Sequence, residues 1–196
     1  MTEGSEVPKE GDSLRRFVAF EGATRIASGG QAQVALAAKQ VLLRNPAVSV
    51  IVFDRATGKV ADLDLRGAEQ ELIARYTPPA PCASARGRPK LGVVAREVTL
   101  LPRHWDWLAR QPGGASITLR RLVESARKAD GGATTSRERI EATYRFMTAI
   151  AGDLPGFEEA ARALFANDRS GLAAVTAQWP TDIRDEVLRF LEDATP

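Results

Sequence analysis

Cysteine and histidine are almost absent from this sequence, which has one of each, Cys82 and His104. A lone cysteine excludes an intrachain disulfide, and the expected compartment is therefore the cytoplasm. One histidine and one cysteine are too few for a His/Cys zinc site, so we expect no metal and no cofactor. No apolar run approaches the ~20 residues that a membrane helix needs, and we expect no membrane contact.

Familiar catalytic motifs are also missing. Ser28-Gly29-Gly30 precedes a predicted helix, but neither GxGxxG nor a GKS/T motif surrounds it, so an ordinary turn is the simpler interpretation. Asp62 and Asp64 lie two residues apart on a predicted strand, where a solvated strand face explains both carboxylates. We therefore expect that the protein is not an enzyme.

Positive charge is concentrated in the middle of the chain. Residues 85–128 carry ten basic and three acidic side chains, a net charge of +7, whereas the whole chain has a net charge of +2. Residues 135–196 carry seven basic and eleven acidic side chains. This asymmetry indicates a polyanionic partner, most simply nucleic acid, and an acidic protein is the alternative.

Apolar periodicity predicts an α+β fold that becomes all-α towards the C-terminus. Short apolar runs predict the order ββα-ββα with an antiparallel sheet, and Ser28 is expected to cap the first helix. From residue 135 onwards, stripes of period 3.6 predict a helical bundle whose first helix is capped by Ser136 and ends at Gly152. The predicted strands are 17–20, 25–27, 48–53 and 60–65, and the predicted N-terminal helices are 28–44 and 69–76.

Composition divides the chain into five segments. A proline-rich stretch that starts at Thr77 indicates an extended linker and is the clearest boundary. The predicted segments are a disordered tail, 1–15; an α+β domain, 16–76; a proline-rich basic linker, 77–90; a ribbon-helix-helix-like segment, 91–130; and a helical domain, 135–196.

A short basic motif, Arg86-Gly87-Arg88-Pro89, lies at the end of this linker. It resembles an AT-hook, a family in which a Gly-Arg-Pro core lies in the narrow minor groove of A·T-rich DNA. Glycine permits close approach, proline keeps the backbone extended, and arginine is attracted by the negative potential of the groove. The resemblance implies DNA contacts by Arg86, Arg88 and Lys90, whereas the alternative is a basic linker that recognises nothing.

The pattern of the central segment predicts a strand followed by two helices. A short strand over 96–101 precedes Pro102, which suits the first turn of a helix, and a Gly-Gly turn separates this helix from the next. Ser116 is placed to cap the second helix. The apolar stripe of that helix is Leu119, Leu122, Val123 and Ala126. In the alternative interpretation this strand-helix-helix unit is part of an ordinary single-chain core.

The same residues resemble a ribbon-helix-helix DNA-binding unit. In that family the strand pairs with that of a second chain and enters the major groove, and the N-terminus of the second helix holds a phosphate. The resemblance implies a homodimer, with strand readers among Arg96, Val98 and Leu100 or, in the other phase, Glu97, Thr99 and Leu101. Neither strand face has the run of Arg, Lys, Asn or Gln that reads base edges. The candidate nucleic-acid-binding residues here are Arg96, Thr99, Arg103, Ser116, Arg120 and Arg121.

Two tryptophans lie close together in the first helix of this unit. Trp105 and Trp107 are two residues apart and therefore point to different helix faces. One is expected in the core and the other at the surface. Stacking of a base on Trp107 requires an exposed ring.

Several sequence segments from Phe17 onwards resemble those of an uncharacterised bacterial family, domain of unknown function 2239. They are Val52-Phe53-Asp54, Asp62 to Gly67, Gly87 to Leu108 and Gly152 to Phe157. This resemblance implies no activity. From the charge pattern we expect a DNA-binding protein, either a transcriptional regulator or an accessory chromosomal protein, and the alternative is a protein-interaction adaptor. Arginines gathered on one exposed face favour DNA binding, and an exposed Trp or Leu patch favours the adaptor.

Overall fold

A four-stranded antiparallel sheet is the centre of the larger part of the protein. The structure, a computed structural model, describes residues 16–77 and 96–192. The strands are β1 (Phe17–Glu21), β2 (Thr24–Gly29), β3 (Val50–Asp54) and β4 (Lys59–Val60), in the order β2-β1-β3-β4. All neighbouring strands are antiparallel, which confirms the predicted α+β class and the antiparallel sheet.

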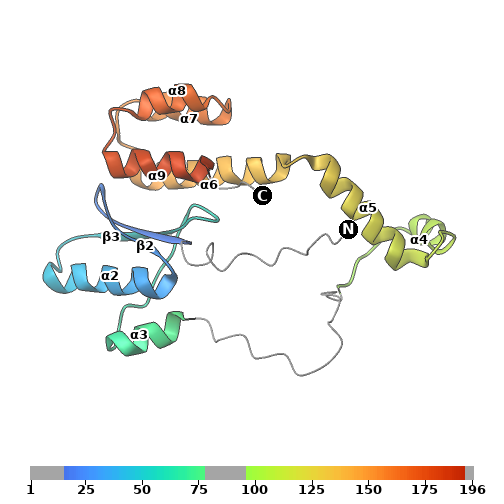
Figure 1. Cartoon of the computed structure of the whole chain (residues 1–196), viewed down its shortest axis with the longest axis horizontal. Coiled ribbons are helices and arrows are strands. Elements are labelled where there is room, and N and C mark those ends of the chain that lie inside the picture. The colour runs from blue at the N-terminus through green and yellow to red at the C-terminus, as the bar shows by residue number, and fades with distance from the viewer. Residues whose placement is uncertain (1–15, 78–95, 193–196) are drawn as a thin grey trace, which may run out of the picture. The chain divides into compact units, whose positions relative to one another are not determined.

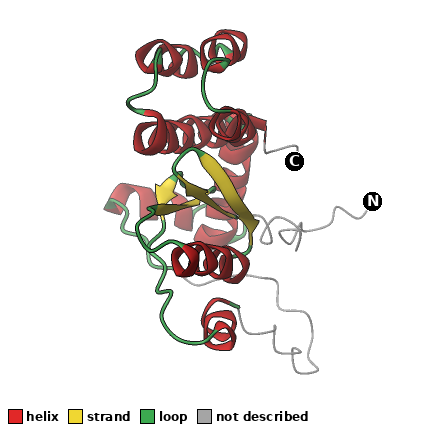
Figure 2. Cartoon of the chain, turned by 90° about the vertical axis from the view of Figure 1, so that its left-hand side faces the viewer, coloured by secondary structure: helices red, strands yellow, loops and turns green. Residues whose placement is uncertain are grey.

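Alternation along the strands gives this sheet two buried faces. Phe20 and Phe53 are fully buried on one face, and Ala19 is fully buried on the other. Helix α2 (Gln31–Arg44) covers the Ala19 face through Val34. The C-terminal helices cover the opposite face, so that the strands lie between two layers of helices (Figure 2).

The C-terminal layer contains α6 (Ala133–Ala151), α7 (Phe157–Phe165), α8 (Arg169–Thr176) and α9 (Thr181–Glu192). Its central aromatic ring is Phe146 of α6, whose centroid lies 5.6 Å from that of Phe20, 4.8 Å from Phe53 and 5.2 Å from Phe190. The strands and these helices therefore share one core. They form one compact unit, residues 1–78 and 135–196, which we call the sheet unit (Figure 1). Composition and patterning had indicated two separate domains for the same residues.

Position 58, in the turn between β3 and β4, requires glycine for two reasons, its backbone conformation and the close approach of helix α6. Its φ of +66° lies in the left-handed region that glycine favours. A Cβ atom at this position would lie 1.9 Å from the carbonyl oxygen of Ala142 in α6. The turn packs against α6 because this residue has no side chain.

Two predicted helix caps are wrong. The N-cap of α2 is Gly30, which has no side-chain cap, and Ser28 belongs to β2. Helix α6 begins at Ala133 rather than at Ser136, and the carboxylate of Asp130 accepts hydrogen bonds in its first turn. Both helices start where the backbone turns, and in each case a serine nearby in the sequence was mistaken for the cap.

The fourth strand is shorter than predicted. It ends at Val60, although the apolar alternation continues to Leu65. Beyond it, the backbone of Asp64 bonds to side chains of α3 (Glu69–Tyr76): its N–H donates to the hydroxyl of Tyr76 (2.6 Å), and its carbonyl accepts from Arg75 (2.7 Å). After one further hydrogen bond with β3, from the Ala61 N–H to the Val52 carbonyl (2.7 Å), these contacts hold the segment in place of a longer ladder.

The second compact unit, residues 79–134, is called the central unit here. Its described helices are α4 (Pro102–Ala109) and α5 (Gly114–Asp130), and Pro102 begins α4 as predicted. Residues 96–101 have no regular secondary structure, so the prediction of a strand there is wrong. The described residues of this unit contain no other strand with which it could pair. Gly131 and Gly132, both with positive φ, separate α5 from α6.

Several predictions lie outside the described residues. They are the tail, 1–15, the linker from residue 78 with its AT-hook-like motif, and residues 91–95 of the predicted ribbon-helix-helix-like segment. Among the described helices, none is both long enough and apolar enough to cross a membrane.

Candidate functional site in the central helix pair

Helices α4 and α5 form a small unit with a minimal core. Among the described residues of the central unit, Leu108 and Thr118 alone are buried, with exposed fractions of 3 % and 0 %. The Thr118 hydroxyl finds no hydrogen-bond acceptor or donor in the described chain. Most side chains of this unit are therefore available for contact with another molecule.

Ser116 does not cap the second helix. The N-cap of α5 is Gly113, whose φ of +85° makes a tight turn, and the helix already begins at Gly114. Ser116 lies inside the first turn, where its carbonyl accepts a hydrogen bond from Nε of Arg120 (3.2 Å). The predicted cap by Ser116 is therefore wrong, whereas the binding of a phosphate at this end of α5 stays a prediction. Glycine residues compete well for such positions, because only they adopt the left-handed conformation without strain.

One face of α5 is basic. Arg120, Arg121, Arg127 and Lys128 are all exposed. Their spacing of i, i+1, i+7 and i+8 places them within one third of the helix circumference. Glu124 lies on the same face and forms a salt bridge with Arg127 (2.9 Å), and this hydrogen-bonded guanidinium lowers the pKa of the Glu124 carboxyl. The face keeps a clear excess of positive charge.

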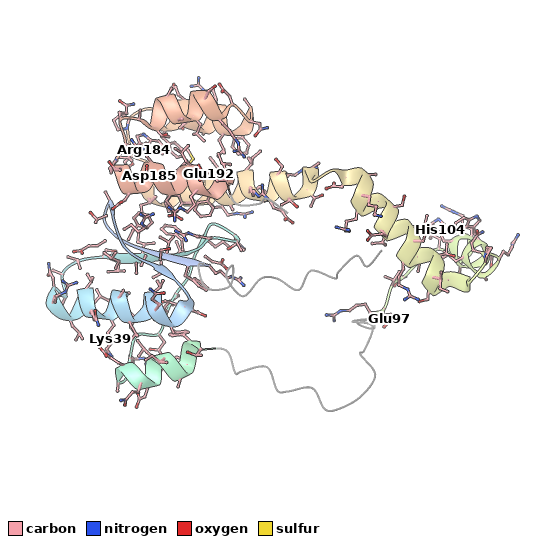
Figure 3. All side chains as sticks on the ribbon, in the orientation of Figure 1. Lys39, Glu97, His104, Arg184, Asp185 and Glu192 are labelled. Atoms are coloured by element: carbon pink, nitrogen blue, oxygen red, sulfur yellow. The ribbon has the colours of Figure 1, made fainter. Side chains whose placement is uncertain are left out.

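An apolar groove lies between α4 and α5. Its volume is about 260 Å³, and its lining residues are Leu100, His104, Trp107, Leu108, Leu119 and Leu122. Leu122 and Val123 of the predicted stripe remain 45 % and 65 % exposed. The stripe was predicted correctly as apolar, but the described helix pair covers little of it. Figure 3 labels His104 on α4 and Glu97 in the segment that precedes it.

Both tryptophans of α4 are exposed, so the prediction that one of them lies in the core is wrong. Trp105 is 42 % and Trp107 is 49 % exposed. Helix α4 has two turns, and Leu108 is its one buried residue. A helix this short buries little against its neighbour and leaves both bulky rings partly in solvent.

The other candidate residues are dispersed. Arg96, Thr99 and Arg103 are exposed, and Arg96 and Thr99 lie in the segment without regular structure. Arg120 and Arg121 share the basic face of α5. Arg86, Arg88 and Lys90 lie outside the described residues.

Three basic residues of this surface were missed from the sequence. Arg127 and Lys128 repeat the positions of Arg120 and Arg121 seven residues further on, a spacing that a helical projection reveals. Arg110 follows Trp107 by three residues, and Arg103 precedes it by four. Arg103, Trp107 and Arg110 therefore share one face of α4.

A second polar cluster lies in the sheet unit, and it holds the fold together. The buried carboxylate of Glu186 on α9 accepts hydrogen bonds from Nε (2.6 Å) and an amino group (2.8 Å) of Arg55. Arg25 lies 3.4 Å from the same carboxylate, and its backbone N–H donates to Asp182 (2.9 Å). Each charge here faces a partner from another element, so we assign the cluster a structural role.

The protein is of the α+β class, and its central helix pair is basic on one side and leaves apolar side chains exposed on the other. The chain belongs to the family described as an uncharacterized protein conserved in bacteria, DUF2239, whose model matches residues 16–191. The family resemblance expected from the sequence is thereby confirmed. No curated protein and no solved structure matches the chain.

Proposed function

We propose that this protein binds nucleic acid through the basic face of α5, as a transcriptional regulator or an accessory chromosomal protein. The observation that carries the proposal is the arrangement of Arg120, Arg121, Arg127 and Lys128 on one exposed helix face. From Arg120 to Lys128 the face is about 12 Å long, enough for several consecutive phosphates of one strand.

Salt dependence of binding is the direct test. If the four cations each neutralise one phosphate, affinity for duplex DNA falls with salt with a log–log slope of about −4. Substituting Arg121→Gln together with Lys128→Gln is expected to reduce that slope by about 2. Neither side chain forms a salt bridge within the described chain, so helix stability is little affected.

A matched control removes the same charge elsewhere. Arg44→Gln with Lys59→Gln changes two exposed cations of the sheet unit and is expected to leave the slope unchanged. Fluorescence anisotropy of a labelled duplex at several salt concentrations measures all three proteins. Absence of duplex binding by the wild-type protein at ~50 mM salt, where electrostatic binding is favoured, contradicts the proposal.

An interaction adaptor is the second candidate function. The exposed apolar side chains of the central unit favour it, because monomeric proteins rarely leave such a patch uncovered. An acidic protein partner would then meet the basic face of α5. The two functions differ in the anisotropy experiment, since an adaptor binds no duplex at low salt.

We also propose that the protein is a homodimer. The central unit buries two of its described residues, too few for an independent core, and Leu101 and Val123 are exposed outside the groove. A second copy packed on these side chains would supply the missing contacts. Sedimentation equilibrium at micromolar concentration tests this, and a monomer there contradicts it.

A further inference from the structure

We propose that Arg103, Trp107 and Arg110 of α4 form a site for single-stranded nucleic acid, in which one unpaired base stacks on Trp107. The inference rests on the proposed nucleic-acid binding and narrows it to a class of substrate. Duplex is bound by the basic face of α5 alone, whereas a single strand also uses α4.

The three side chains share one face of their helix. At 100° per residue, the spacing i, i+4 and i+7 places them within about 60° of one another. Arg110 follows the last residue of α4, and its φ of −84° and ψ of −6° continue the right-handed helical path. An aromatic ring thus lies between two cations along a line of roughly 10 Å.

The ring of Trp107 is available for stacking. It is 49 % exposed, and within the described residues no aromatic ring or guanidinium stacks on it. It also lines the apolar groove of about 260 Å³ between α4 and α5. That volume is below the usual range of ~300–1,000 Å³ for drug-sized ligands, and it suits one planar ring.

Charge complementarity identifies the occupant as a nucleotide rather than an apolar peptide. Arg103 and Arg110 are exposed, and neither forms a salt bridge with a described residue. Asp106, the one carboxylate of α4, is three residues after Arg103 and four before Arg110, about 60° and 40° from them around the helix. It forms no salt bridge with a described residue, and the three side chains together keep a net charge of +1. A base between two phosphates has the same alternation of aromatic ring and charge.

The geometry points to an unpaired base. In a duplex both faces of each base are covered by its neighbours, whereas the bases of a single strand present a free face to an aromatic side chain. Stacking of this kind tolerates any base, so we expect little sequence preference.

Trp107→Ala, with Trp105→Ala as the matched control, tests the site. The two residues are on the same helix and are similarly exposed, but their positions differ by about 160° around it. Binding of labelled oligothymidylate is expected to weaken about 5- to 150-fold in Trp107→Ala and less than 2-fold in Trp105→Ala. Duplex affinity should be unchanged in both variants.

A second set of variants shows that the ring acts by stacking. Trp107→Phe retains an aromatic face and is expected to recover most of the affinity lost in Trp107→Ala. In a protein with Trp105→Phe and Trp179→Phe, Trp107 is the sole tryptophan, and its emission should be quenched by oligothymidylate but not by duplex. Arg103→Gln and Arg110→Gln should each reduce the single-strand salt slope by about 0.7.

Several outcomes overturn the inference. They are an equal effect of Trp107→Ala and Trp105→Ala, an equal loss of duplex and single-strand binding in Trp107→Ala, or unchanged Trp107 emission with bound oligothymidylate. If one of these outcomes is found but the protein still binds duplex, and the α5 substitutions still reduce the salt slope, the single-strand site is disproved while the proposed function stands. If the wild-type protein binds neither duplex nor oligothymidylate at ~50 mM salt, the proposed function fails as well.

Discussion

Replacing Arg55 with methionine is expected to destabilise the sheet unit strongly. The guanidinium of Arg55 makes the two short hydrogen bonds to Glu186, at 2.6 and 2.8 Å. The Glu186 side chain is fully buried, so the substitution leaves its carboxylate with the longer, 3.4 Å contact to Arg25. Removing one partner of a buried ion pair costs about 3–5 kcal/mol. That is a large share of the roughly 5–15 kcal/mol that stabilises a folded domain.

A double variant separates the lost ion pair from a general disturbance of the core. Arg55→Met combined with Glu186→Leu removes both charges and replaces them with apolar groups of similar size. Such exchanges are often neutral or stabilising, because the cost of burying the ions disappears with them. We expect the double variant to unfold within about 1 kcal/mol of the wild type, although the Ser28 hydroxyl also loses the hydrogen bond from Arg55.

Tryptophan fluorescence measures the unfolding of the sheet unit. Trp179 lies in the core of the sheet unit with 4 % exposure, and Trp105→Phe with Trp107→Phe makes it the sole tryptophan. Urea unfolding in that background yields the free energies, and a loss of 3–5 kcal/mol corresponds to a fall in Tm of about 6–20 °C. A loss below about 1 kcal/mol in Arg55→Met, or an equal loss in the single and double variants, would refute the reasoning.

Three further predictions concern stability. Thr118→Val removes a buried hydroxyl that has no partner in the described chain and should raise the Tm of the central unit, measured by circular dichroism; a lower Tm contradicts this. Gly58→Ala should cost at least about 1–2 kcal/mol from its left-handed backbone, and more from its contact with α6, so an unchanged urea midpoint counts against it. The Gly171 N–H lowers the pKa of Asp168, the N-cap of α8. Its stabilisation is therefore present above about pH 4 and lost as the pH falls through the lower folded pKa. The Tm difference between wild type and Asp168→Ala should shrink below pH 4, and a constant difference disproves the assignment.

Local patterns of the sequence determined most of the secondary structure. The continuous apolar runs at Phe17–Glu21 and Val50–Asp54 predicted two central strands, because a strand buried on both faces is apolar at successive positions. Pro102 marked the start of α4, since its fixed φ and missing N–H are tolerated in the first turn. The apolar stripe of α5 was equally predictable from the sequence, but its exposure to solvent was not.

The caps were less predictable from the sequence. Ser28, Ser116 and Ser136 all had the residue type that caps helices, yet Gly30 and Gly113 hold the N-cap positions of α2 and α5. A capping residue is defined by its backbone conformation, which depends on where the preceding segment enters the helix. The sequence shows candidates within a few residues of one another and does not choose between them.

The sequence by itself determined where the positive charge lies, where most of the helices and strands form, and that the class is α+β. Tertiary structure alone decided that the strands and the C-terminal helices share one core, through contacts such as that of Arg55 with Glu186, 131 residues later in the chain. It also decided that Trp105 and Trp107 are both exposed. Periodicity and composition are local properties of the chain, whereas burial depends on which distant segment covers a residue. A tryptophan has the same pattern in the sequence whether a neighbouring helix covers its ring or leaves it in solvent.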